Sequence, residues 1–169
     1  MLNNLFIVGF MSIHIRIANP PKEFTEKFPT EVKEFYYKYS KKVYSIVISD
    51  EIKNFIEEML KIENIDINKI IDARIMIFPC YRSSDSTYGL VDNDSGQISI
   101  YPIFSYQNEK VIPSCLIDFT NENLNFIIIT QVVHTLIHEI LHLKYLDEDD
   151  IELRAERYVA NLCKRLEYF

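Results

Sequence analysis

The feature that most constrains the fold is a long apolar segment near the C-terminal end that carries three polar side chains. The residues from Phe126 to Leu143 are apolar on nearly every face of a helix, so we expect a buried core helix. This segment nevertheless contains His138, Glu139 and His142. Because unpartnered polar groups are costly to bury, all three side chains need partners inside the protein.

The spacing of these three residues indicates what the partner is. Residues four apart lie on one face of a helix, so His138 and His142 can present both imidazoles to one metal ion. Glu139 points to the side of that pair, within reach of a metal-bound water. The HExxH pattern therefore predicts a zinc site. His134 lies one turn earlier, and since one zinc ion spans a single turn comfortably, we expect it to line the cleft or to pack within the helix.

A catalytic zinc usually takes three protein ligands, so a third must come from elsewhere in the chain. Beyond the acidic segment 147–150, which is expected to be a solvated turn, a second helix is predicted over about 149–166. A short connection favours an antiparallel pair, in which Glu152 would face His142 and Glu156 would face His138. Helical phase favours Glu152 as the ligand because Glu156 lies nearer to solvent, and Glu156 is the alternative.

The rest of the chain predicts an α+β fold with a small mixed sheet. A strand is expected over 2–11, and apolar alternation and turn residues predict further strands at 12–17, 43–48, 70–78, 86–91 and 97–101 and helices at 30–40, 50–62 and 122–146. The acidic segment 92–96 is predicted to be a hairpin turn. Its register rejects a calcium loop, because Val91 and Pro102 would stand where ligands are required.

Composition limits the class of protein and its partners. The 169 residues suit one domain, and 48% hydrophobic residues are enough for a full core. The net charge of −7 and the lack of a basic run argue against nucleic acid as a partner, and we expect no membrane span. Cys80, Cys115 and Cys163 form no CxxC pair, which favours a reduced, cytoplasmic protein. The oligomeric state stays open.

The metal motif and the helix after it resemble a known pattern. His138-Glu-Ile-Leu-His142, followed by Glu152-Leu-Arg-Ala155-Glu-Arg-Tyr158-Val-Ala160, is similar to the HExxH…ExxA(N/D)xFA pattern of gluzincin-type metallopeptidases, especially ImmA/IrrE-like peptidases and archaeal minigluzincins. The chain departs from it at Leu141, where glycine is common, and at Glu156, where Asn or Asp is usual. The resemblance covers about 70–166 and leaves 1–49 as an N-terminal extension of unknown role.

The resemblance implies a zincin-like fold, with an edge-strand hairpin, a buried metal helix and an antiparallel glutamate helix. The implied function is zinc-dependent hydrolysis of peptide bonds, with Glu139 as general base and acid. A peptide or protein substrate would add as a strand along Gln97, Ile98, Ser99, Ile100 and Tyr101. Tyr158, Tyr145 or His134 would stabilise the oxyanion.

Two other functions fit the same residues. One is a regulatory protease of the ImmA/IrrE sort that cuts one repressor-like protein. The other is a non-catalytic, zinc-stabilised binding domain, which requires a closed site with a fourth protein ligand. The candidate ligands for that closed site are His138, His142, Glu152 and Cys115.

Overall fold

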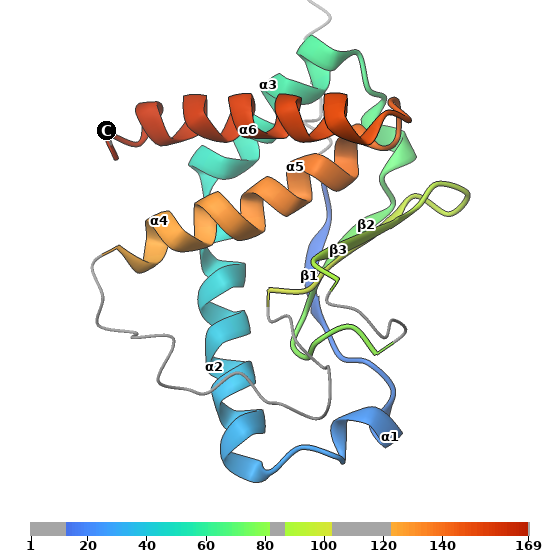
Figure 1. Ribbon diagram of the computed structural model, residues 1–169, viewed down its shortest axis with the longest axis vertical. Helices are drawn as coiled ribbons and strands as arrows, with labels where there is room; N and C mark the ends of the chain where they lie inside the picture. The colour runs from blue at the N-terminus through green and yellow to red at the C-terminus, as the bar shows by residue number, and fades with distance from the viewer. Residues whose placement is uncertain (1–12, 82–86, 103–122, 169) are drawn as a thin grey trace, which may run out of the picture.

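In the computed structural model, which describes residues 13–81, 87–102 and 123–168, a small sheet packs against a layer of helices (Figure 1). The sheet is mixed and four-stranded, in the order β1-β2-β4-β3. Its strands are β1 (Ile15–Ala18), β2 (Asp72–Met76), β3 (Gly89–Asp92) and β4 (Gln97–Ile100). β1, β2 and β4 are parallel, and β3 pairs with β4 in the antiparallel sense. The predicted α+β class with a small mixed sheet is confirmed.

Helices account for most of the remaining described residues. They are α1 (Lys22–Thr25), α2 (Thr30–Val47), α3 (Asp50–Glu63), η1 (Ile67–Lys69), α4 (Leu124–Ile128), η4 (Ile129–Val133), α5 (His134–Leu141) and α6 (Glu148–Arg165). α4, α5 and the π-helical turn η4 between them follow one another without a break and form the predicted long apolar helix. Figure 1 shows α6 running back across α5 in the opposite direction.

Local sequence signals explain where several of these elements begin and end. The Ser49 side chain accepts a hydrogen bond from the backbone N–H of Ile52 and caps α3, as its sequence predicts. Residues 43–48, expected as a strand, instead continue α2 as far as Val47. Val43 and Val47 are one turn apart and both fully buried, so packing of that helical face overrides the β-propensity of the segment.

The hairpin between β3 and β4 forms at the predicted acidic turn. The Asp92 carboxylate accepts hydrogen bonds from the backbone N–H groups of Asp94 and Ser95, at 3.1 and 3.2 Å. Gly96 has a φ of 68°, and a Cβ at this position would lie against the carbonyl oxygen of Lys69. The turn therefore requires glycine here.

The strand order leaves no free edge on the strand that was predicted to align a substrate. β4 (Gln97–Ile100) has β2 on one side and β3 on the other, so both of its edges are occupied and no further strand can pair with it. Ile98 and Ile100 are buried in the core. Gln97, Ser99 and Tyr101 line a separate cavity of about 580 Å³, which Arg16 and Arg74 also line. Among the described strands, β1 and β3 are the edges of the sheet, and β3 is the edge that contacts α5.

A single apolar cluster joins the N-terminal helices to the helix that carries the HExxH motif. It includes Phe24, Tyr36 and Ile56 from the first part of the chain and Leu136 and Ile140 from α5. Residues 13–49, expected as an extension, therefore contribute to the same core as the motif. The predicted strand at 2–11 lies outside the described residues.

One apolar helix in the described part of the chain is long enough to cross a membrane. It spans Leu124–Leu141, and most of it is buried inside the protein. This matches its position as the central core helix, between the sheet and α6.

Candidate metal centre

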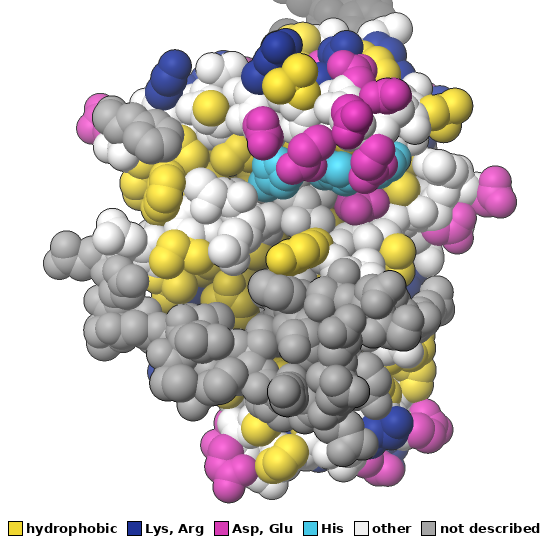
Figure 2. Space-filling view, in the orientation of Figure 1, with side chains coloured by type: hydrophobic (Ala, Val, Ile, Leu, Met, Phe, Trp, Pro, Cys, Tyr) yellow, Lys and Arg dark blue, Asp and Glu magenta, His cyan; other side chains and the backbone are white. Residues whose placement is uncertain are grey.

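The three residues of the HExxH motif lie at the C-terminal end of the core helix, where it meets the start of α6. His138 and Glu139 are in α5, and His142 is the residue that ends it. Figure 2 shows the histidines in a band across one face of the molecule, with Asp and Glu side chains around them. The apolar residues of α5 are buried, whereas the three histidines are partly exposed.

Three side chains bring their metal-ligating atoms together at this point. His138 Nε2 lies 3.1 Å from His142 Nε2. Glu148 Oε1 lies 3.0 Å from His138 Nε2, and Glu148 Oε2 lies 3.3 Å from His142 Nε2. Tetrahedral zinc with bonds of about 2.0–2.1 Å needs its ligand atoms about 3.3 Å apart. These three residues thus match the size of a zinc site.

The chemistry of this group also fits a cation. Burial lowers the pKa of His142, which favours the neutral imidazole that metals bind. His138 faces a carboxylate from each of its two ring nitrogens, Glu148 at Nε2 and Glu152 at Nδ1. A carboxylate can only accept, so both contacts are favourable when Nδ1 carries its proton and a proton or a cation lies beside Nε2.

Glu152, the predicted third ligand, lies on the other side of His138. Its Oε2 is 2.9 Å from His138 Nδ1, and its Oε1 is 3.5 Å from His134 Nε2. If a metal lies where the two Nε2 atoms converge, Glu152 orients His138 instead of binding the metal. Such a carboxylate–histidine pair is a common support for metal ligands.

The position of Glu152 follows from where the core helix ends. The helix was predicted to continue to residue 146, but α5 ends at Leu141. The chain therefore reverses direction sooner than predicted. As a result, each residue of α6 faces a residue of α5 that lies nearer to the N-terminus than the predicted one. Glu152 consequently faces His138 and His134, not His142, and Glu148 takes the place opposite His142.

Sequence reasoning assigned Glu148 to a solvated turn. The signal that could have identified it is Asp147, whose carboxylate accepts a hydrogen bond from the backbone N–H of Asp150 at 2.8 Å and caps α6. That cap puts Glu148 in the first turn of the helix, where the helix dipole favours a negative charge.

Glu139 is the most buried of the polar residues around the histidines. It is 8% exposed, and burial raises its pKa to about 7 although the neighbouring His138 lowers it. The backbone of β3 leaves it little space. A Cβ added to Gly89 would lie 2.5 Å from Glu139 Oε1 and 2.7 Å from Thr135 Cγ2. Glycine at this position lets the edge strand approach the Glu139 carboxylate.

A cavity of about 830 Å³ opens beside these residues, between the edge strand and the two helices. His134, expected to line the cleft or to pack in the helix, is part of its wall together with His138 and Glu139. Among the described residues of the wall, the other charged side chains are all acidic, namely Glu148, Glu152 and Glu156. Opposite them lie Thr87, Tyr88 and Gly89, which include the start of β3. Thr87, Tyr88 and Gly89 were not predicted to border the site.

Two predicted oxyanion-stabilising residues point elsewhere. The hydroxyls of Tyr145 and Tyr158 both donate to the Glu63 carboxylate, each at 2.6 Å. Neither tyrosine lines the cavity beside Glu139. Of the residues predicted to stabilise the oxyanion, His134 is the one that lies in the cavity wall. Cys115, a conceivable fourth ligand, lies outside the described residues.

Comparison with known proteins adds no relative to this description. No protein-family model, no curated protein and no solved structure matches the chain.

Proposed function

We propose that this protein is a zinc-dependent metallopeptidase of zincin-like fold. One observation carries the proposal: the Nε2 atoms of His138 and His142 converge with the Glu148 carboxylate beside a buried glutamate, Glu139, at the wall of a large cavity. We assign His138, His142 and Glu148 as ligands, with Glu152 holding His138 through Nδ1. Glu156 remains a charged wall residue.

When bound, zinc supplies a Lewis acid and brings the pKa of a water near neutrality. Glu139 takes the proton of the attacking water and gives it to the leaving amine. The water oxygen first forms its bond to the carbonyl carbon, and the carbon–nitrogen bond breaks afterwards, when the nitrogen receives the proton from Glu139. The buried position of Glu139 holds its carboxylate in one place for both transfers.

The edge strand β3 offers a way to align a peptide substrate. The start of β3 borders the cavity. Among the described strands, β3 pairs only with β4, so its other edge has no strand beside it. An extended substrate can add to such an edge through main-chain hydrogen bonds, next to Glu139. This proposal moves the substrate strand from Gln97–Tyr101 to residues 88–92.

The proposal includes a cytoplasmic location. Cys80 and Cys163 are free and buried in the structure, which suits a reducing compartment.

The test measures bound metal and the cleavage of an unfolded protein, casein, with and without a chelator. We expect zinc near one equivalent and cleavage that is lost with the chelator and restored by added zinc. Bound zinc without cleavage of casein would favour a regulatory protease with one target or a non-catalytic zinc domain. Absence of bound zinc after reconstitution would contradict the proposal.

A further inference from the structure

The side chain of Glu63, far from the HExxH motif in sequence, is a buried carboxylate at the last residue of α3. It is 6% exposed, and the helix ends just after it at Asn64, whose φ is 52°. Its carboxylate accepts short hydrogen bonds from Tyr145 and Tyr158, both at 2.6 Å. A carboxylate buried in this way requires strong partners to stay in place.

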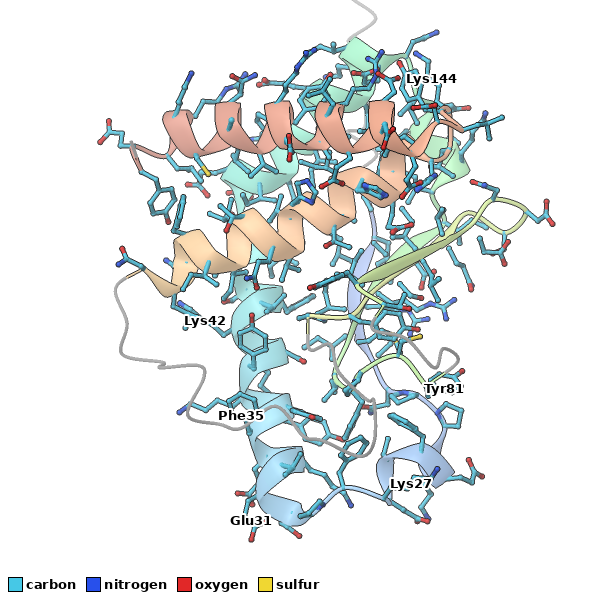
Figure 3. All side chains as sticks on the ribbon, in the orientation of Figure 1. Lys27, Glu31, Phe35, Lys42, Tyr81 and Lys144 are labelled. Atoms are coloured by element: carbon cyan, nitrogen blue, oxygen red, sulfur yellow. The ribbon has the colours of Figure 1, made fainter. Side chains whose placement is uncertain are left out.

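The partners of Glu63 come from the turn between α5 and α6 and from α6 itself. In the turn, Lys144 donates to the Glu63 backbone carbonyl, and Tyr145 donates to its carboxylate. Figure 3 labels Lys144 at this turn. On α6, Arg154 Nη1 lies 3.6 Å from Glu63 Oε1. One residue of α3 thus contacts the segment that connects His142 to Glu148.

These contacts lie on the side of α6 away from the metal site. Residues two apart on a helix point about 200° from each other, so Arg154 faces away from Glu152. The Arg154 guanidinium lies 4.3 Å from the centre of the Tyr145 ring, and its Nε donates to Asp150 at 2.8 Å. Arg154 therefore contacts both the segment between α5 and α6, through Tyr145, and the first helical turn of α6, through Asp150. Glu148 belongs to that first helical turn.

We propose that Glu63 is a positioning residue for the metal centre, which fixes the turn and the start of α6 so that Glu148 and Glu152 face the two histidines. This inference rests on the proposed function. It also gives the N-terminal part of the chain a role, because Glu63 of α3 holds the segment between α5 and α6 in position. Burial alone would raise the pKa of Glu63, but the two tyrosine hydroxyls and the nearby Arg154 and Lys144 lower it, which fits an ionised carboxylate.

The test uses the full chain and two readouts, the zinc dissociation constant and the visible absorption of the cobalt-substituted protein. Cobalt absorption reports ligand geometry, which a loss of general stability does not change. We expect Glu63→Gln to weaken zinc binding about 10–100-fold and to alter the cobalt spectrum. Tyr145→Phe removes one hydroxyl from the turn and keeps the carboxylate. It should change the zinc affinity and the cobalt spectrum in the same direction as Glu63→Gln, by a smaller amount. If Glu63→Gln fails to fold, Tyr145→Phe provides the test in its place.

The control is Ile56→Val, a buried position on the same helix that takes no part in the Glu63 contacts. It should lower the unfolding temperature and leave both readouts at wild-type values. Unchanged readouts in Glu63→Gln and Tyr145→Phe, with zinc bound by the wild type, would overturn the positioning role and leave the proposed function intact. An equal change in Ile56→Val would overturn it as well. A wild-type protein that binds neither metal would overturn both proposals.

Discussion

At the scale of single residues, Glu139 depends on a neighbour that the motif does not contain. The side chain is held in a narrow space under β3, where Gly89 has no Cβ to obstruct it. The histidines and Glu139 could be predicted because their relation is local, one turn of one helix. Gly89 could not, because it reaches the site only through tertiary structure. The Asp147 cap indicates that Glu148 begins α6, but the histidines that it faces depend on how α5 and α6 pack.

Gly89→Ala should therefore impair catalysis without removing the metal. The new Cβ would lie 2.7 Å from Glu139 Cγ, so the carboxylate must shift. We expect kcat to fall about 100-fold, since misplacing a reacting group by about 1 Å has effects of that size. Zinc affinity should stay near the wild-type value. The control is Ile71→Ala, at an exposed position just before β2, and comparable losses in both variants would refute this account of Gly89.

At the scale of elements, the sequence predicts which segments are helices and strands better than it predicts how they meet. α3, α6 and the β3–β4 hairpin are close to their predicted positions because caps, turn residues and apolar periodicity are local signals. The predicted end of α5, residue 146, lies beyond the observed end at Leu141. In an antiparallel pair, this error changes which residues of α5 and α6 face each other. The order of strands in the sheet could not be predicted either. The alternation of apolar residues in β4 would be the same in a central strand and in an edge strand.

The facing of α5 and α6 predicts a ranking of three glutamates in zinc affinity. Glu148→Ala removes a ligand and should raise the zinc dissociation constant by orders of magnitude. Glu152→Ala removes the partner of His138 Nδ1 and should raise it about 10–100-fold. Glu156→Ala should leave it nearly unchanged. If Glu152→Ala has the larger effect, the third ligand is Glu152, as the sequence first indicated.

At the scale of the whole molecule, the metal centre joins parts of the chain that are distant in sequence. α3, the sheet and the α5–α6 pair share one core, so the metal ligands are in place only in the folded protein. The burial of α5 was predictable from its composition. The participation of the N-terminal helices was not, because their amphipathic pattern does not specify what they pack against.

Zinc should accordingly stabilise the folded state. Free zinc at 1,000 times its dissociation constant contributes about 4 kcal/mol, which corresponds to about 8–16 °C in the unfolding temperature of a domain of this size. Thermal unfolding with and without a chelator measures this shift. His142→Ala, which lacks a ligand, should show little response to the chelator. An unchanged midpoint in the wild type, with zinc verifiably removed, would argue against a site formed by folding.

The central claim is tested most directly by measuring the amount of bound zinc and the rate of peptide cleavage in Glu139→Gln and in the wild type. Glu139 is the buried residue assigned to move the proton and is not among the three that could hold the metal. The account predicts zinc at wild-type stoichiometry and cleavage reduced to background. Loss of zinc together with activity would show that Glu139 is a ligand, and retained cleavage would show that it is not the base.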